Sequence, residues 1–435
     1  MDSHEYARRR RALMRMMGDD AIALVPASPH AVRNRDVEYP YRQDADLMYL
    51  TGFPEPDAIA AICPGRDQGE FVLFCRERDP DREVWHGPRA GLEGAVERFG
   101  ADDAFPISDV DEILPGIIEG CSRIYCSMGR YAAFDRRVMD WVNEVRSHMR
   151  SGAPAPHEFI SLDYILHDMR LYKSRDEVRA MQRAARISMA AHERAIQACR
   201  PGLHEYELEA AFWHEFRRNN AEPAYGIIVG GGANGCVLHY VNNDAVLNDG
   251  DLVLIDAGCE CDGYAADITR TFPINGRFSA SQRQVYEIVL NAQKAALAEV
   301  RPGAHWNDPH DTAVRVITAG LIELGLLSGD RDARIEDGSY KRFFMHRVGH
   351  WLGMDVHDVG DYKVDGGWRE LEAGMCLTIE PGLYIPPSAD IPEHLRGMGV
   401  RIEDDVHVTK TGSDVLTSDL AKEIDDIEDL MQRQR

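Results

Sequence analysis

Four carboxylates and one imidazole in the second half of the sequence have the residue types of a metal site: Asp256, Asp267, His350, Glu380 and Glu403. Asp256 ends the apolar run 252–255, and Glu380 ends the apolar run 377–379 before a proline and a glycine. A carboxylate buried without a counter-charge is costly, so these positions favour a cation between them. Four negative charges balance two divalent cations, and such a pair can activate water and polarise a carbonyl. The set predicts a two-metal hydrolase.

The residue types also indicate which ions would bind. Carboxylate-rich coordination suits hard or borderline cations, so we expect two divalent ions, with Mn²⁺ the leading candidate and Zn²⁺ or Co²⁺ as alternatives. Taken singly, each residue has an ordinary explanation. Asp256 and Asp267 could be solvated aspartates on a surface hairpin, and Glu380 or Glu403 could be an ion-paired strand residue. The metal hypothesis therefore depends on the five residues meeting in space.

The two aspartates lie in a segment that predicts a β-hairpin. Residues 252–271 surround a turn at Asp262 and Gly263, a pair that two-residue hairpin loops prefer. With an even number of loop residues, positions whose numbers add to an odd value face each other, as those of Asp256 and Asp267 do. Their side chains then lie opposite or diagonal on one face, within about 5–8 Å at Cβ. Two like charges placed so close favour a bound cation.

Three histidines fall in the segment 346–357: His346, His350 and His357. A single histidine is more often a hydrogen-bonded core residue than a ligand, so the interpretation depends on all three together. Because Arg347 follows His346, the segment is not the HExxH motif of the zincins. Further along, Arg401 and Glu403 are two apart on a predicted strand and therefore share a face.

Length and charge limit the classes of function. The chain has 435 residues and a hydrophobic fraction of 44%, which predicts a folded protein with two domains. A net charge of −24 repels nucleic acid phosphates and anionic lipid, so we expect neither partner. The basic run from Arg8 to Arg11 is the local exception, and we interpret it as the solvated face of an amphipathic helix at 5–17.

Cysteine usage and the start of the chain predict a cytoplasmic protein. Nine cysteines are scattered without a disulfide framework, which is typical of a reducing compartment. Residues 1–11 are charged rather than apolar, so we expect no signal peptide. We also expect no membrane span, since no apolar stretch is long enough.

Hydrophobic periodicity divides the chain near residue 173. The first part alternates strands and helices, with strands at 21–25, 58–63, 70–74 and 122–126 and helices at 92–99 and 132–149. A capping box of Ser174 and Glu177 then opens a helix that ends near 199. Helices at 205–218, 281–300 and 309–327 precede antiparallel strand patterns from 345 to 409. We expect an α+β protein, with a mixed α/β domain at 1–172 and a catalytic domain at 173–435 that has a curved antiparallel sheet.

In their local contexts, the five candidate ligands resemble those of the creatinase and methionine aminopeptidase superfamily, whose fold is called pita-bread. The resemblance is closest to the aminopeptidase P family and covers nearly the whole chain. Four further segments carry it: EYPYRQDADLMYLTGF at 38–53, MRLYKS at 169–174, NGCVLHY at 234–240 and HWLGMDVHDVG at 350–360. The resemblance implies a pita-bread catalytic domain that follows an N-terminal domain of the aminopeptidase P type.

The resemblance also implies an activity. The expected enzyme removes the N-terminal residue from peptides with proline second, by attack of a hydroxide that bridges the metals, with Asp267 and Glu403 as the bridging ligands. Glu380 would relay the proton, His357 and His346 would stabilise the oxyanion, and Arg401 would orient a ligand. The implied substrate-binding residues are His239 and Tyr384 at the proline, and Asp36, Trp85 and Arg150 in this or a neighbouring subunit. The family suggests a homo-oligomer, either a dimer or a tetramer.

Three alternatives differ in substrate or in class. A proline dipeptidase shares the fold and the metals but cuts only dipeptides, and the N-terminal match favours the aminopeptidase. Creatinase-like chemistry needs no metal, which the complete ligand set opposes. A non-catalytic pita-bread protein that binds a partner would have no reason to keep all five ligands.

Overall fold

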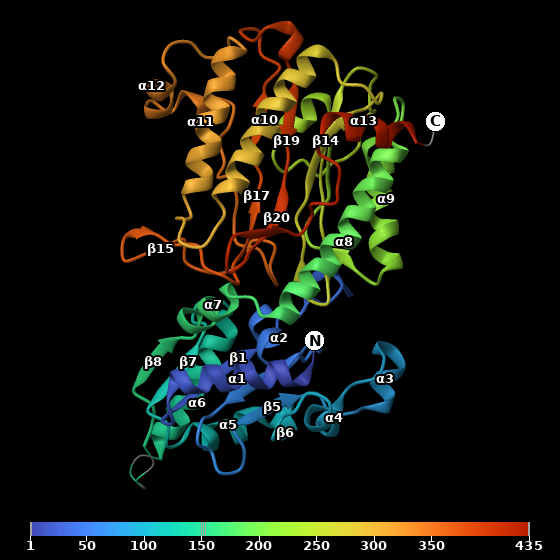
Figure 1. Cartoon of the computed structure of the whole chain (residues 1–435). Coiled ribbons are helices and arrows are strands. Elements are labelled where there is room, and N and C mark those ends of the chain that lie inside the picture. The colour runs from blue at the N-terminus through green and yellow to red at the C-terminus, as the bar shows by residue number, and fades with distance from the viewer. Residues whose placement is uncertain (1, 149, 151, 153, 434–435) are drawn as a thin grey trace. The chain divides into compact units, whose positions relative to one another are not determined.

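The computed structural model describes residues 2–148, 150, 152 and 154–433 (Figure 1). The chain divides into two compact units, Met1–Met169 and Arg170–Arg435, called unit 1 and unit 2 below. Among the described residues, no helix combines the length and the apolar character that crossing a membrane requires.

Unit 1 is built on a mixed six-stranded sheet with the strand order β6-β5-β4-β1-β7-β8. Its strands are β1 (Ala21–Pro26), β4 (Ile59–Ile62), β5 (Phe71–Cys75), β6 (Asp103–Pro106), β7 (Arg123–Cys126) and β8 (Glu158–Ser161). The neighbours of β1 run in opposite senses, because β4 pairs with it antiparallel and β7 parallel. Every second residue of these apolar strands, such as Ile22 and Phe74, packs against α5 (Val110–Ile118) and α6 (Ala132–Ser147).

The remaining elements of unit 1 are shorter or lie at its surface. The helices are α1 (Ser3–Met17), α2 (Ala45–Thr51), α3 (Pro80–His86) and α4 (Gly91–Glu97), and α7 (Asp163–Leu171) follows β8 and extends two residues into unit 2. Two short strands, β2 (Val32–Asn34) and β3 (Val37–Glu38), form an exposed hairpin.

The basic run in α1 corrects one expectation. Arg9 and Arg10 are buried, with exposed fractions of 1% and 6%, so only Arg8 and Arg11 of the run are exposed to solvent. Arg9 donates to the carbonyl of Tyr49 and Arg10 to that of Leu50, each at 2.9 Å, where α2 ends. Carbonyls at the C-terminal end of a helix lack intrahelical partners and carry partial negative charge, which compensates the buried guanidinium groups.

Unit 2 combines antiparallel strands with two long helix pairs. Three sheets have the orders β10-β11-β14, β13-β12-β9 and β17-β20-β21, and β18 pairs with β19. The strands are β9 (Glu222–Pro223), β10 (Ile228–Gly231), β11 (Leu252–Asp256), β12 (Cys259–Cys261), β13 (Tyr264–Ala265), β14 (Thr269–Pro273), β15 (Lys363–Val364), β16 (Gly367–Trp368), β17 (Cys376–Ile379), β18 (Gly382–Ile385), β19 (Met398–Arg401), β20 (Asp404–Val408) and β21 (Ser413–Val415). Each strand pairing of unit 2 in the described residues is antiparallel, as predicted.

The helices of unit 2 flank these strands on two sides (Figure 1). They are α8 (Arg175–Ala198), α9 (Glu205–Arg218), α10 (Ala280–Glu299), α11 (Asp308–Glu323), α12 (Arg331–Glu336) and α13 (Ile424–Gln432). α8 packs on α9, and α10 packs on α11. The predicted capping box opens α8, because Ser174 Oγ accepts from the Glu177 amide and the Glu177 carboxylate accepts from the Ser174 amide.

Candidate metal centre and active site

The hairpin that carries the two aspartates has the predicted register. Cys261 pairs with Tyr264 and Asp256 with Thr269, so the turn is Asp262-Gly263, with φ of 55° and 79° at these residues. Asp267 lies two residues before Thr269 and is therefore diagonal to Asp256 on the same face.

The backbones of the hairpin approach closely beside the aspartates. A Cβ atom on Gly258 would lie 1.7 Å from the Ala266 carbonyl oxygen, a distance that no side chain can adopt. Glycine at this position therefore lets the two arms carry Asp256 and Asp267 toward the same point.

The other three candidate ligands come from the ends of neighbouring strands. Glu380 directly follows β17, and Glu403 lies between β19 and β20. The His350 segment runs beside β17, because the Thr378 amide donates to the His350 carbonyl at 3.0 Å and the Glu380 amide donates to the Val348 carbonyl at 2.7 Å. Strand pairing thus places the imidazole beside Glu380.

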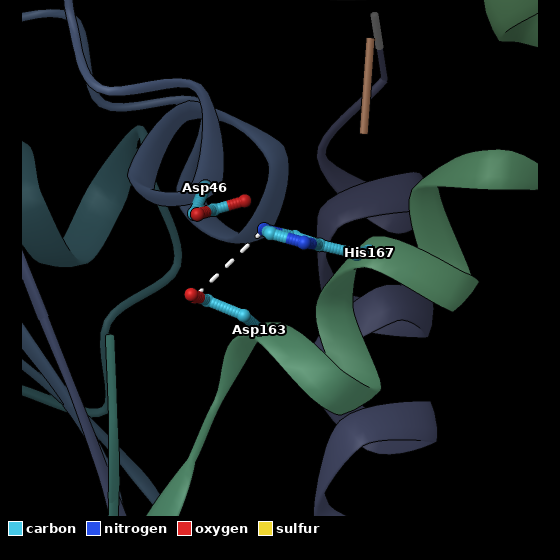
Figure 2. A group of neighbouring side chains, drawn as sticks. All are labelled: Asp46, Asp163 and His167. Atoms are coloured by element: carbon cyan, nitrogen blue, oxygen red, sulfur yellow. Dashed lines mark ion pairs between the residues drawn. The ribbon is translucent and has the colours of Figure 1, made fainter. Parts of the chain in front are cut away.

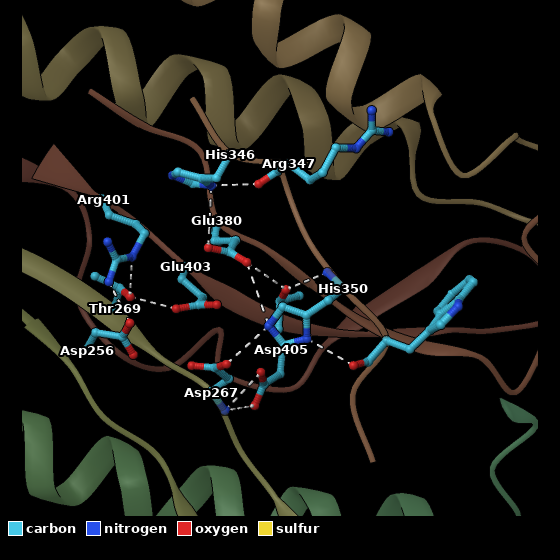
Figure 3. A network of polar contacts seen from close by, with 12 residues as sticks. Asp256, Asp267, Thr269, His346, Arg347, His350, Glu380, Arg401, Glu403 and Asp405 are labelled. Carbon is cyan, nitrogen blue, oxygen red and sulfur yellow. Dashed lines mark hydrogen bonds and ion pairs between the residues drawn. The ribbon is translucent and has the colours of Figure 1, made fainter. Parts of the chain in front are cut away.

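The five side chains point toward one another in one cavity of about 560 Å³ (Figure 3). His350 Nε2 lies 3.3 Å from Asp267 Oδ2 and 3.7 Å from Glu380 Oε1. Ligand atoms of Asp267, His350 and Glu403 all lie within 4.8 Å of one another. Three donors at that mutual distance can bind one ion, and Asp256 and Glu380 line the same cavity.

The electrostatics of the cavity fit a site built for cations. Burial raises the pKa of Glu380 to about 7, and it raises the pKa of Glu403 well above its ordinary value, with the neighbouring carboxylates adding to the rise. Burial alone would raise the pKa of Asp267, but the hydrogen bond and charge of His350, together with Tyr225 and Arg401, outweigh burial and lower the pKa. Acids that are hard to ionise together become stable as carboxylates when divalent cations lie between them, so the donor set fits two such ions.

Arg401 joins both arms of the hairpin to the cavity. Its side chain is 4% exposed, and it donates to Asp256 Oδ2 at 2.5 Å and to Thr269 Oγ1 at 3.0 Å. Thr269 in turn donates to Glu403 Oε2 at 2.6 Å. Arg401 therefore fixes the orientation of Asp256 directly and that of Glu403 through Thr269.

Comparisons with known proteins agree with this geometry. The sequence profile described as metallopeptidase family M24 matches residues 179–410, and the profile described as aminopeptidase P, N-terminal domain, matches residues 6–125. The chain belongs to metallopeptidase family M24. It is 46% identical to the Xaa-Pro aminopeptidase of Escherichia coli (strain K12), over 98% of this chain and 97% of that protein. It is 35% identical to Xaa-Pro aminopeptidase 3 of Rattus norvegicus, over 99% of this chain and 86% of that protein.

Solved structures of the family superpose over the whole length. Aminopeptidase PepP of Pseudomonas aeruginosa has a TM-score of 0.98 at 59% identity and covers 99% of this chain and 98% of its own. Zinc-substituted Escherichia coli aminopeptidase P in complex with product has a TM-score of 0.97 at 45% identity, covering 100% and 99%. The resemblance to aminopeptidase P and the α+β pita-bread fold are thereby confirmed.

Around the M24 centre, the predicted histidines and tyrosine lie at different depths. His346 Nε2 is 2.8 Å from the Tyr384 hydroxyl, and Arg401 donates to the same hydroxyl at 2.9 Å. The His357 ring centroid is 4.3 Å from that of His350, and His239 lies on the cavity wall. Burial lowers the pKa of His346 to about 4, so this ring is neutral at pH 7.

Two polar residues that the sequence did not point to contact the centre. The Tyr225 hydroxyl lies 2.6 Å from Asp256 Oδ1 and 2.5 Å from Asp267 Oδ1. The Asp405 carboxylate accepts from the Asp267 amide at 3.2 Å. Asp405 lies in β20, two residues after Glu403, and this spacing is a signal that could have found it, whereas Tyr225 lies far from both aspartates in sequence.

Three predicted substrate contacts lie in unit 1, outside the unit that forms the cavity. Asp36 is exposed in the turn between β2 and β3, and Arg150 is exposed after α6. Trp85 on α3 is 82% exposed, which rules out a role in the packing of this chain. Their assignment to substrate binding stays a prediction.

A second group of possible ligands lies in unit 1, where Asp46, Asp163 and His167 face one another (Figure 2). His167 Nε2 is 3.8 Å from Asp163 Oδ1, and Asp46 forms an ion pair with Arg130 at 2.8 Å. Ser127 donates to Asp163. Because protein groups already compensate these carboxylates, we interpret the group as a hydrogen-bonded ion network.

Proposed function

We propose that this chain is a Xaa-Pro aminopeptidase that uses two divalent metal ions to release the N-terminal residue from peptides with proline second. The observation that carries this proposal is the convergence of four carboxylates, two buried and two partly buried, with His350 in one cavity of a chain that belongs to family M24. The 46% identity to a Xaa-Pro aminopeptidase over nearly the full length supports the same activity.

The chemistry of the substrate explains the need for a dedicated site. An Xaa-Pro bond is a tertiary amide without an N–H, so a protease that binds that N–H cannot hold it. The proline nitrogen must also be protonated before it can leave. The site must therefore supply a proton at a defined place beside the scissile bond.

Asp256, Asp267, His350, Glu380 and Glu403 would hold the ions, which when bound would activate a water molecule and polarise the scissile carbonyl. Glu380 accepts the proton of the attacking water and delivers it to the proline nitrogen. Glu380 lines the cavity with an oxygen 3.7 Å from His350, so its carboxylate is placed among the ligands where this proton transfer would occur.

The surrounding side chains position the substrate and stabilise developing charge. His357 and His346 donate N–H groups to the oxyanion or to the next carbonyl. His239 and Tyr384 enclose the proline, and Arg401 keeps Asp256 oriented through their 2.5 Å contact.

Several finer statements belong to the same proposal. Mn²⁺ is the proposed metal because the donors are mostly carboxylates, with Zn²⁺ or Co²⁺ as alternatives. The protein acts in the cytoplasm as a homodimer or homotetramer. We place the domain boundary between residues 172 and 173, directly before the capping box of α8, and the compactness of the two units supports such a division.

Hydrolysis of Ala-Pro-Ala tests the proposal against its nearest alternative. After chelation and readdition of Mn²⁺, we expect release of alanine and Pro-Ala, detected by mass spectrometry. Cleavage of Ala-Pro with no cleavage of Ala-Pro-Ala would instead identify a dipeptidase. Failure to cleave either peptide with Mn²⁺, Zn²⁺ or Co²⁺ would contradict a proline peptidase altogether.

A further inference from the structure

A cationic aromatic cluster lies at the edge of the active-site cavity. It consists of Arg347, Lys363 and Trp368, called the rim cluster below. The Arg347 guanidinium lies 4.8 Å and the Lys363 ammonium 4.4 Å from the centroid of the Trp368 ring. Lys363 and Trp368 belong to the two strands of the β15–β16 hairpin, whose turn has φ of 50° at Asp365 and 81° at Gly366. Two positive charges are thus held by one ring on a short hairpin.

Arg347 differs from the other cation of the cavity wall. Arg401 is almost fully buried and is bound to Asp256, so its charge serves the metal ligands. Arg347 is exposed and donates to the neutral side-chain oxygen of Asn307. In Figure 3 its side chain points away from the carboxylates at the centre. Within the described residues, it forms no ion pair, and exposed Asp311 is the acidic group that acts on it through space.

The direction of the substrate places the rim cluster beyond the proline. An aminopeptidase that removes one residue holds the N-terminal end of the peptide at the metal ligands, and two of these, Asp267 and Glu403, are 6% and 1% exposed. The rest of the peptide must leave through the solvent-exposed side of the cavity. Arg347 and Trp368 line the same cavity and are more exposed than the ligands, so they lie where the third and later residues pass.

We propose that the rim cluster selects substrates that carry a carboxylate at or beyond the third residue, with Arg347 as the residue that determines this specificity. The inference rests on the proposed function, because it needs a peptide bound with its N-terminus at the metals. A carboxylate from an acidic side chain or from the C-terminus of a tripeptide would serve equally. Because the net charge of −24 repels acidic peptides in general, binding of such a peptide would depend on a local positive site of this kind.

Peptides that differ only in charge test the proposal. The substrates are Ala-Pro-Asp-amide, Ala-Pro-Asn-amide and Ala-Pro-Lys-amide, whose blocked C-termini leave the third side chain as the variable, and Ala-Pro-Asn with a free carboxylate. For an exposed ion pair, we expect kcat/KM for the Asp peptide to exceed that for the Asn peptide by about two- to fivefold, mainly through KM. If the rim cluster also binds the C-terminal carboxylate, kcat/KM for free Ala-Pro-Asn should exceed that for its amide by a similar factor.

Variants of Arg347 separate recognition from structure. Arg347→Gln should bring the Asp-to-Asn ratio to about one, and Arg347→Glu should reverse the order so that the Lys peptide is preferred. If the substitution only disturbed packing, kcat/KM would fall for all peptides together, and the order of preference among the peptides would not be reversed. Lys341→Gln is the matched control, because it removes an exposed positive charge near in sequence but outside the cavity wall. Raising the salt concentration to 0.5 M should lower the Asp-to-Asn ratio of kcat/KM in the wild type, because salt screens the exposed charges.

The outcomes distinguish this inference from the proposed function. Equal kcat/KM for all peptides in the wild type, or an Asp-to-Asn ratio that Arg347→Glu leaves unchanged, would overturn the proposed role of the rim cluster. Neither result would contradict the proposed aminopeptidase activity. Absence of cleavage of every peptide would overturn both.

Discussion

Burial acts in opposite directions on the acids and bases of this cavity. It raises the pKa of Glu380 to about 7 and lowers that of His346 to about 4, because each charged form loses hydration. His350 is the exception, since its hydrogen bond to Asp267 and the nearby Glu380 outweigh burial and raise its pKa to about 9. Residue identity alone would give none of these values.

Glu380→Ala should lower turnover of Ala-Pro-Ala by at least about 10³-fold, because it removes both a metal ligand and the proposed proton relay. The bound metal, measured by mass spectrometry of the purified variant, should also fall. Glu370→Ala, which changes an exposed glutamate of the same unit, is the control. Near-normal turnover by Glu380→Ala would contradict the assignment.

At the scale of the elements, close backbone contacts determine where the ligands meet. Gly258 lets β11 and β12 approach the arm that carries Asp267, and Gly349 lets the His350 segment approach β17, where an added Cβ would lie 2.0 Å from the Thr378 carbonyl oxygen. The site therefore depends on strand pairing as much as on the ligand side chains.

Gly258→Ala should destabilise unit 2 by about 1–3 kcal/mol or more, because the new methyl group forces the hairpin arms apart. The displacement should also weaken metal binding, measured by titration with Mn²⁺. Gly412→Ala is a matched control, since its Cβ would meet nothing within 4 Å. Equal stability and metal affinity of the two variants would show that the hairpin tolerates the change.

A buried ion network anchors the segment that follows His357. Asp358 accepts from Arg170 at 2.6 Å and from Lys173 at 2.9 Å, and all three side chains are 1% exposed. Burial would raise the pKa of Asp358, but Lys173 and Arg170 outweigh it and lower the pKa. The ionised form is therefore stabilised in the folded chain, and the stability it contributes is present above the unfolded pKa of about 3.9 and lost as pH falls below it.

Asp358→Asn should lower the free energy of unfolding by about 3–5 kcal/mol at pH 7, because buried Lys173 loses its charged partner and buried Arg170 keeps only its ion pair with Asp355. The difference from the wild type should narrow as pH falls below about 4, where the carboxyl of the unfolded wild-type chain becomes protonated, and should vanish below the lowered pKa of the folded carboxyl. Urea denaturation at several pH values measures both effects. Asp361→Asn, at an exposed carboxylate nearby, should change little at any pH.

At the scale of the whole molecule, the metal ligands and three of the predicted substrate contacts belong to different units. The five candidate ligands all belong to unit 2, whereas Asp36, Trp85 and Arg150 belong to unit 1. Removal of the ions should therefore affect the stability of one unit and not of the other.

Chelation should lower the unfolding temperature of unit 2, because ions that bind only the folded state stabilise it, by about 2.7 kcal/mol at a free concentration of 100 Kd. Readdition of Mn²⁺ should restore both stability and activity in differential scanning calorimetry and peptide assays. Asp267→Asn, which removes a ligand, should abolish the thermal shift. A shift of equal size in that variant would place the ions elsewhere.

The sequence by itself determined the residue types of the site, the hairpin register and the approximate bounds of the long helices of unit 2. Asp262-Gly263 marks a two-residue turn, and the fixed alternation of strand side chains then places Asp256 and Asp267 on one face whatever surrounds them. The helix expected at 205–218 has those bounds, and the capping box at Ser174 begins α8 as expected. These are local properties, which a short segment specifies through its own backbone geometry.

Only the tertiary structure decided how distant segments meet. Tyr225 contacts both aspartates, Arg9 and Arg10 are buried against α2, and Arg347 stacks on Trp368. Each of these contacts joins residues from separate elements, and local periodicity carries no information about such partners. The charge state of the metal centre is likewise decided by the tertiary structure, because the pKa values of its residues depend on burial and on neighbours that the fold brings together.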